Sequence, residues 1–402
     1  MSDSFSGINP DRAPEGYMPS ALLRILSAVS TPALVAKTAD IDLGLAEHMP
    51  FPFLALVGQN EMRIALLLAV INPNVGGVLL IGPRGTGKTT AVRSLSDLLP
   101  EVEVSACEEG CLPEDYARSG ETAVCPNCAA KLKRGEPITR WTAVKMIELP
   151  LNARLEDVVG GINERIALQQ QRVRLERGIL ARADQNILYV DEVNLLDDAI
   201  VDAILDAAAA GSYTVRRGPM VGTYRSRFVL IGSMNPEEGN LRPQLMDRFG
   251  LRVVVRGLTA RDERLEIYRR VSAYRANPRA FLRQWAAATA EARAEIEQAR
   301  ALLKEVTLSE QALDLGLDLV RMLDIDSHRA EFTLFEAARA HAAADGRLQA
   351  NAQDVQAVAA LALRQRRSEF MVRYSQQQQA EDENIRQQAQ AILQARQDGQ
   401  RK

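Results

Sequence analysis

A phosphate-binding pattern, G-x-x-x-x-G-K-[ST], occupies residues 82–89. Its members in order are Gly82, Pro83, Arg84, Gly85, Thr86, Gly87, Lys88 and Thr89. Glycines let backbone N–H groups surround phosphate oxygens, Lys88 places a positive charge on the β- and γ-phosphates, and Thr89 offers a hydroxyl to Mg²⁺. An apolar run precedes the loop, and Thr90 opens a helix expected over 90–99. This order predicts an ATP site that includes Thr90, and not a chance glycine-rich turn.

Two adjacent acids, Asp191 and Glu192, follow the apolar run Ile187–Val190. A buried strand that ends in two carboxylates is costly unless the acids have partners. Beside a phosphate loop, we expect Asp191 in the Mg²⁺ shell and Glu192 polarising the attacking water. The alternative interpretation is a strand end with two solvated acids.

A short amide, Asn235, follows the apolar run Arg227–Ile231 within the segment Gly232–Gly239. At the end of a strand beside the two acids, it can hold the attacking water between the γ-phosphate and Glu192. Alone, the segment would be an ordinary Asn-Pro turn. Together with the other two motifs, it is predicted to be catalytic.

An arginine, Arg248, lies just before the apolar run Leu251–Val255. Such an arginine is usually a surface charge. Ring-forming ATPases, however, insert an arginine from one subunit into the nucleotide site of the next. Arg248 is the first candidate for that role and Arg242 is the second.

Four cysteines fall within one short stretch with the pattern C-x3-C-x13-C-x2-C: Cys107, Cys111, Cys125 and Cys128. In a reducing compartment such clusters more often bind metal than form disulfides. Tetrahedral Zn²⁺ takes four thiolates, and pairs two to four residues apart give the required turn. We expect a structural zinc site that takes no part in hydrolysis; a redox dithiol switch and inert thiols are the alternatives.

Short apolar runs must position these motifs. From about residue 51 to 258, such apolar runs alternate with helical patterns. The runs are Gly77–Ile81, Asn186–Val190, Arg227–Ile231 and Leu251–Val255. Continuous apolar strands separated by helices indicate an α/β fold with a parallel sheet buried on both faces. Ligands bind at the carboxyl ends of such strands, which is where the polar motifs lie.

Beyond Thr259 the strand signals end and helical spacing takes over, for example at Leu313, Leu317 and Val320, flanked by Leu319 and Leu323. The chain is therefore divided into an N-terminal extension (1–48), a core (49–258) with the cysteine loop (107–128), a helical region (259–373) and a Gln-rich tail (374–402).

The composition limits the class of protein. The 402 residues carry 49 Lys plus Arg and 52 Asp plus Glu, a net charge of −3, which argues against a general nucleic-acid binder. No apolar run approaches the roughly 20 residues of a membrane span, and the polar start is unlike a secretory signal. We expect a cytoplasmic protein.

These motifs together resemble the AAA+ ATPase subunit of magnesium chelatase, the I subunit. The resemblance runs from about residue 51 to 367 and is most specific in the segments 235–239 and 241–250, Asn-Pro-Glu-Glu-Gly and Leu-Arg-Pro-Gln-Leu-Met-Asp-Arg-Phe-Gly. It implies a P-loop NTPase core with a central parallel sheet flanked by helices, plus a smaller all-helical lid. It also implies a hexameric ring that hydrolyses MgATP and drives Mg²⁺ insertion into protoporphyrin IX. Its partners would be an adaptor with a von Willebrand A domain and a large porphyrin-binding subunit, in chlorophyll or bacteriochlorophyll synthesis.

The same resemblance assigns further residues. Val57, Gly58 and Gln59 would lie near the adenine, and Arg329 matches the lid arginine that reaches the γ-phosphate. Residues 211–221 match an inserted hairpin, and residues 149–167 match a second insertion. Glu336 stands where an arginine is expected.

Two other interpretations stay open at this point. One is a cobalt-chelatase motor or a MoxR-like, chaperone-type AAA+ protein that acts with a von Willebrand A adaptor. The other is a DNA-remodelling AAA+ protein whose hairpin would carry Arg216 and Arg217 into DNA; the charge of −3 weighs against it.

Overall fold

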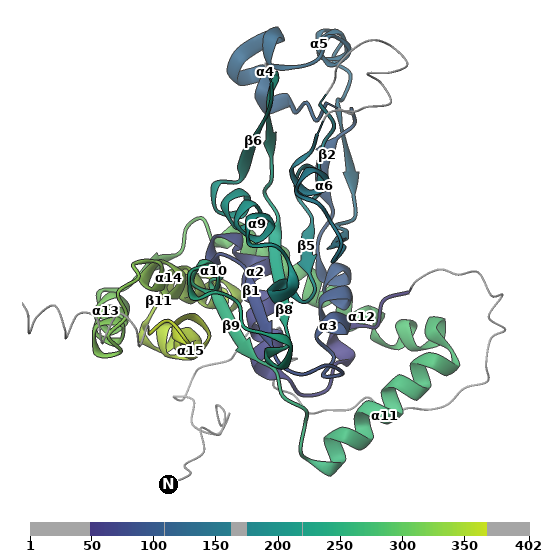
Figure 1. Ribbon diagram of the computed structural model, residues 1–402. Coiled ribbons are helices and arrows are strands. Elements are labelled where there is room, and N and C mark those ends of the chain that lie inside the picture. The colour runs from purple at the N-terminus through teal and green to yellow at the C-terminus, as the bar shows by residue number, and fades with distance from the viewer. Residues whose placement is uncertain (1–48, 108, 162–174, 219, 368–402) are drawn as a thin grey trace, which may run out of the picture.

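A parallel sheet lies at the centre of the structure (Figure 1). The computed structural model describes residues 49–107, 109–161, 175–218 and 220–367, and within these ranges five strands form the sheet in the order β4-β5-β8-β1-β9. Their bounds are β1 Val78–Ile81, β4 Met146–Leu149, β5 Ile187–Val190, β8 Val229–Met234 and β9 Leu251–Val254. All four neighbouring pairs run parallel, which confirms the predicted α/β class.

The strands β1, β5 and β8 are buried along their whole length. Alternate residues face opposite layers: Val78 and Leu80 pack in one hydrophobic cluster, Leu79 and Ile81 in the other. Both faces of the sheet are therefore covered, which is why these strands read as continuous apolar runs. The edge strand β4 was not predicted, because it is only partly buried and its sequence Met-Ile-Glu-Leu mixes apolar and charged residues.

Helices cover the two faces of the sheet. On one face α2 Asn60–Ile71 and α3 Lys88–Leu95 contact the strands, and α12 Pro278–Leu302 and α14 Arg329–Ala344 pack on α2. The helix α15 Ala352–Leu363 contacts β9 and belongs to the same hydrophobic cluster. The other layer is built by α6 Leu155–Val159, α8 Ile179–Arg182, α9 Asp198–Ala210 and α10 Pro243–Arg248. The helix after the phosphate loop begins two residues earlier than predicted and ends at Leu95, followed by a 3-10 turn over Ser96–Leu98.

The C-terminal part is helical, as predicted, and consists of α11 Arg261–Ala276, α12, α13 Glu310–Met322, α14 and α15, with a two-residue parallel pair β10 Thr307–Leu308 and β11 Gln349–Ala350. Its core is continuous with that of the sheet, because Ala292, Ile296 and Leu334 belong to the same cluster as Val78. The predicted apolar face of α13 was partly wrong. Leu317 and Leu323 are 51 % and 44 % exposed, while Ala312, Gly316 and Val320 are buried.

A projection extends from the sheet on the side of β5, at the top of Figure 1. One part is the antiparallel hairpin of β6 Ser212–Arg217 and β7 Met220–Arg225, confirming the predicted insertion. The other part, residues 102–142, is called the cysteine module. It contains the antiparallel pair β2 Val102–Ser105 and β3 Thr139–Thr142, with α4 Pro113–Ser119 and α5 Pro126–Lys133 between them.

Some predictions lie outside the described residues: the N-terminal extension, the Gln-rich tail and residues 162–167 of the second insertion. Within the described ranges, no helix is long and apolar enough to cross a membrane.

Candidate nucleotide-binding and active site

The phosphate loop connects β1 to α3 at the carboxyl edge of the sheet. Gly87 caps α3 with a φ of 85°, a conformation that side chains with a Cβ rarely adopt. The Lys88 ammonium folds back over the loop and donates hydrogen bonds to the carbonyls of Gly82 at 2.5 Å and Pro83 at 2.8 Å. Burial lowers the pKa of Lys88, and the charges of Asp191, Glu192 and Glu238 oppose that shift. The lysine is therefore held over the loop by two backbone carbonyls.

A network of hydroxyl groups surrounds Asp191. The Tyr189 hydroxyl donates to Asp191 Oδ1 at 2.9 Å and lies 3.1 Å from Thr89 Oγ1. Ser233 Oγ also donates to Asp191 Oδ1. Burial raises the pKa of Tyr189 to about 12, so its hydroxyl stays protonated at neutral pH. Tyr189 thus connects the two predicted Mg²⁺ ligands, Thr89 and Asp191, whose hydroxyl and carboxylate oxygens are the donors that Mg²⁺ prefers.

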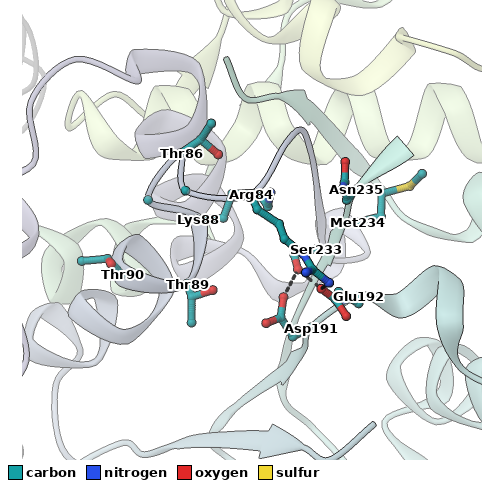
Figure 2. A pocket seen from close by; sticks show the side chains of 12 residues that line it. Arg84, Thr86, Lys88, Thr89, Thr90, Asp191, Glu192, Ser233, Met234 and Asn235 are labelled. Carbon is teal, nitrogen blue, oxygen red and sulfur yellow. Dashed lines mark hydrogen bonds and ion pairs between the residues drawn. The ribbon is translucent and has the colours of Figure 1, made fainter. Parts of the chain in front are cut away.

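An arginine of the phosphate loop holds the predicted catalytic carboxylate. Arg84 Nη2 lies 2.8 Å from Glu192 Oε1 (Figure 2). The same nitrogen lies 2.7 Å from Glu238 Oε1. The hydrogen bond with Glu192 and the nearby acids raise the pKa of Arg84. Glu192 also adopts a left-handed backbone conformation with a φ of 48°, and its N–H donates to Ser233 Oγ at 3.3 Å. These contacts turn the carboxylate toward the phosphate loop instead of the solvent.

The motifs meet in one cavity of about 300 Å³ (Figure 2). Its lining residues are Arg84, Gly85, Thr86, Gly87, Lys88, Thr89, Thr90, Asp191, Glu192, Ser233, Met234 and Asn235. Asn235 is 5 % exposed, and its Oδ1 accepts a hydrogen bond from the Glu237 N–H. The side chains of three separate segments therefore converge on the space in front of the phosphate loop.

A second cavity of about 520 Å³ lies beside β9 and α2. Gln59 lines it and donates a 2.6 Å hydrogen bond from Nε2 to the Arg256 carbonyl. Val57 and Gly58 do not line this cavity. Gly58 nevertheless packs closely on Leu258, which is one of the lining residues. Of the three residues expected near the adenine, only Gln59 lines this cavity.

Arg248 lies at the amino-terminal edge of the sheet, opposite the edge that carries the phosphate loop. Val78, the first residue of β1, pairs with Leu251, the first residue of β9, and Arg248 precedes that strand. The phosphate loop begins only after the last residue of β1, and four strand residues span about 13 Å. Arg248 instead forms ion pairs with Asp206 at 2.6 Å and Asp202 at 3.1 Å on α9. It does not line the cavity of its own chain.

Arg329 belongs to the same edge as Arg248. It is exposed at the start of α14, and the preceding Ser327 donates a 2.7 Å hydrogen bond to Asp247, the neighbour of Arg248. Arg329 is also absent from the lining of the phosphate cavity. The second finger candidate, Arg242, pairs with Asp198 at 2.6 Å. The structure thus brings together the phosphate loop, Asp191, Glu192 and Asn235, and separates Arg248 and Arg329 from them.

Three residues of this site were not predicted from the sequence: Tyr189, Ser233 and Met234. A signal for Tyr189 did exist: a tyrosine in a fully apolar strand must find a hydrogen-bond partner for its hydroxyl. Ser233 carried no distinguishing signal beyond its place at the end of β8.

Comparison with known proteins identifies the family. Residues 318–396 match the family model of the AAA lid domain. The chain is 44 % identical over 322 residues to the magnesium-chelatase subunit ChlI homolog of Methanocaldococcus jannaschii, covering 80 % of this chain and 87 % of the relative. It is 42 % identical to the magnesium-chelatase 38 kDa subunit of Rhodobacter capsulatus, covering 83 % and 92 %, and 41 % identical to ChlI of Synechocystis, covering 79 % and 88 %.

Solved structures give similar matches. A structure of the complex between subunits BchI and BchD of magnesium chelatase, from single-particle cryo-EM, contains a chain that is 38 % identical, with a TM-score of 0.45 over 81 % of this chain and 99 % of that one. A candidate ATPase from Cytophaga hutchinsonii is 20 % identical with a TM-score of 0.50 over 78 % and 83 %, a likeness of fold alone. The curated relatives do not favour the cobalt-chelatase, MoxR-like or DNA-remodelling alternatives. On the identity to those relatives, this chain belongs to the family of magnesium-chelatase AAA+ ATPase subunits.

Proposed function

We propose that this chain is the ATP-hydrolysing motor subunit of a magnesium chelatase and drives Mg²⁺ insertion into protoporphyrin IX. The names of its relatives support the pathway, which is chlorophyll or bacteriochlorophyll synthesis. The observation that carries the ATPase activity is the convergence of Lys88, Asp191, Glu192 and Asn235 on one cavity. The porphyrin would be held by a partner, because the chemistry of this cavity suits phosphates.

Each residue of the cavity has a proposed role. Lys88 and the loop N–H groups bind the phosphates of ATP, and Thr89 and Asp191 hold the Mg²⁺ that accompanies the nucleotide. Glu192 orients and polarises the attacking water, and Asn235 holds that water toward the γ-phosphate. Tyr189 positions Thr89 and Asp191 relative to each other through its hydroxyl.

We further propose that hydrolysis needs a neighbouring copy in a ring, with six copies as the expected number. The support is the position of the two arginines. Arg248 and Arg329 lie at the edge of the sheet opposite their own phosphate loop, and at that edge only the nucleotide of another protomer can reach them. In this arrangement the Asp202 and Asp206 carboxylates hold Arg248 until the neighbour's γ-phosphate competes for it.

The partners and location follow from the family and remain part of the proposal. The ring would act in the cytoplasm with a larger chelatase subunit, through an adaptor that carries a von Willebrand A domain. Nucleic acid is not an expected partner: Arg217 of the hairpin contacts its own chain, 3.5 Å from the Gly160 carbonyl and 3.9 Å from Glu156.

The test separates binding from turnover. Lys88→Ala should abolish tight MgATP binding, whereas Glu192→Gln should bind MgATP normally and lose turnover, because Lys88 contacts the phosphates and Glu192 acts on the water. Binding is measured with a fluorescent ATP analogue and turnover by phosphate release. The control is Glu114→Gln at an exposed position of α4, which should leave nucleotide binding and turnover unchanged. Equal nucleotide affinity of Lys88→Ala and the unmodified protein would contradict the assignment.

A second assay tests the chelatase role. The full chain is mixed with the adaptor and porphyrin-binding subunits, protoporphyrin IX, Mg²⁺ and ATP, and the fluorescence of magnesium protoporphyrin is followed. Product should form with the unmodified chain and fail with Glu192→Gln. Product formation at the same rate without this chain would overturn the proposal.

A further inference from the structure

The four cysteines of the cysteine module converge on one point. Cys107 follows β2, Cys111 lies in the loop after it, and Cys125 and Cys128 begin α5, yet their four sulfurs all lie within 4.8 Å of one another. A disulfide would bring two sulfurs to about 2.05 Å, whereas all four cysteines are free. A mutual cluster of four is the arrangement of a single four-coordinate centre.

The spacing of the sulfurs fits a tetrahedral metal. A metal with thiolate bonds of about 2.3 Å needs sulfurs about 3.8 Å apart, so the cluster would contract by at most an ångström. Donors already point at the sulfurs: the Cys111 N–H lies 3.4 Å from Cys107 Sγ and the Cys125 N–H lies 3.2 Å from Cys111 Sγ. Hydrogen bonds of this kind favour the negative thiolate over the thiol.

The module has little else to hold it together. Its hydrophobic cluster has five buried members: Cys111, Val124, Cys128, Ala129 and Ile138. The helix α4 buries no residue, and α5 buries only Cys128 and Ala129. A unit of about 40 residues with so small a core is below the size at which packing alone is sufficient. Two of the five buried residues are themselves cysteines, so the cluster of sulfurs is the centre of this core.

We propose that Cys107, Cys111, Cys125 and Cys128 bind one structural Zn²⁺ as a tetrathiolate and that this ion holds the cysteine module in shape. All four coordination positions are filled by protein sulfur, which is the pattern of a structural and not a catalytic zinc site. The site is separate from the phosphate cavity, and no cysteine lines that cavity. The proposal is therefore independent of the ATPase mechanism.

The zinc site also supports the hairpin of β6 and β7. Arg225 of β7 forms an ion pair with Asp115 of α4 and donates a 3.4 Å hydrogen bond to the Gly110 carbonyl. Gly110 lies between Cys107 and Cys111, and Asp115 lies between Cys111 and Cys125, so the positions of both depend on the loop that the metal closes. Loss of the ion should loosen β6 and β7 as well as the module.

The first experiment measures the metal in the unmodified full chain. The protein is purified without added metal or chelator, and its metals are determined by elemental analysis. The expected result is one equivalent of zinc per chain, with X-ray absorption showing four sulfur neighbours at about 2.3 Å. Substitution of Co²⁺ should give the absorption spectrum of a tetrahedral thiolate site. A chain without metal, with either four free thiols or two disulfides, would overturn the proposal, and so would iron in place of zinc.

The second experiment assigns the ligands. Cys125→Ser with Cys128→Ser should reduce the bound zinc to less than a tenth, and Asn127→Ala, an exposed position between those cysteines, should keep it. If the double variant does not fold, removal of zinc from the unmodified protein with a chelator replaces it. Hydrogen exchange should then rise in residues 102–142 and in β6 and β7, and remain unchanged in β1 and β5. Unchanged exchange throughout the projection after complete zinc loss would contradict the structural role.

Discussion

The phosphate cavity lies at the edge of a sheet in which β1, β5 and β8 are buried along their whole length, whereas the cysteine module lies beyond that sheet and has five buried residues. In the first region, the core fixes the backbone and the site residues are placed on it. In the second region, the proposed ligands are themselves the core. Substitutions in the cavity should therefore change rates, and those in the projection should change local stability.

The largest expected effect tests whether the cavity is complete within one chain. Arg248→Ala should bind ATP and assemble normally but lose roughly 10³–10⁵ in hydrolysis rate, because a finger arginine stabilises charge only in the transition state. Mixing it with Glu192→Gln should restore part of the activity, since one junction then has an intact Glu192 and an intact Arg248. ATPase rate is measured against mixing ratio, and sedimentation checks the rings.

The matched control for this prediction carries both substitutions on one chain. Mixed with the unmodified protein, that double variant should lower the ATPase rate of the rings that it enters and should not restore activity. Mixed rings that form from the two single variants and stay inactive would mean that Arg248 is not a finger supplied to a neighbour, and Arg242 would become the candidate.

A smaller effect tests the preorganised network inside the cavity. Tyr189→Phe removes the hydroxyl between Thr89 and Asp191, a change of about 1 kcal/mol, or roughly fivefold, for one hydrogen-bonding group. We expect the Mg²⁺ concentration for half-maximal ATPase activity to rise by that factor. Tyr268→Phe, at a side chain 70 % exposed on α11, is the control. An unchanged Mg²⁺ dependence would remove Tyr189 from the positioning role.

The smallest effect tests the contact between the two parts of the projection. Arg225→Ala removes the ion pair with Asp115, both side chains being partly exposed, and should lower the melting temperature by only ~1–2 °C. Hydrogen exchange should nevertheless rise in β6 and β7, and ATP binding should not change. Arg216→Ala on the same hairpin is the control. A large loss of ATP affinity would show that the two regions are not independent.

The sequence predicted the parts of the site that are continuous in the chain. The phosphate loop needs glycines at fixed offsets, and the pair Asp191–Glu192 directly follows an apolar strand, so both patterns are local. The strands β1, β5 and β8 were predicted because burial on both faces leaves an apolar run. The strand β9 was predicted although the buried Arg252 interrupts its run. Contacts between distant segments left no such pattern. Glu336, which stands where an arginine was expected, accepts a 2.7 Å hydrogen bond from the buried Asn72, 264 positions away.

The sequence by itself thus determined which residue types stand at which spacing in the phosphate loop, the two acids and the cysteine quartet, and the chemistry predicted for each follows from that local pattern. The tertiary structure decided where those groups meet. Strand pairing brought the hydroxyls of Tyr189 and Ser233 together on Asp191 Oδ1 and placed Arg248 at the opposite edge of the sheet from Lys88. The fold also brought Cys107 within 4.8 Å of Cys128, although 20 residues intervene. Such distances depend on the packing of the whole sheet and its helices, to which residues far apart in the chain contribute together.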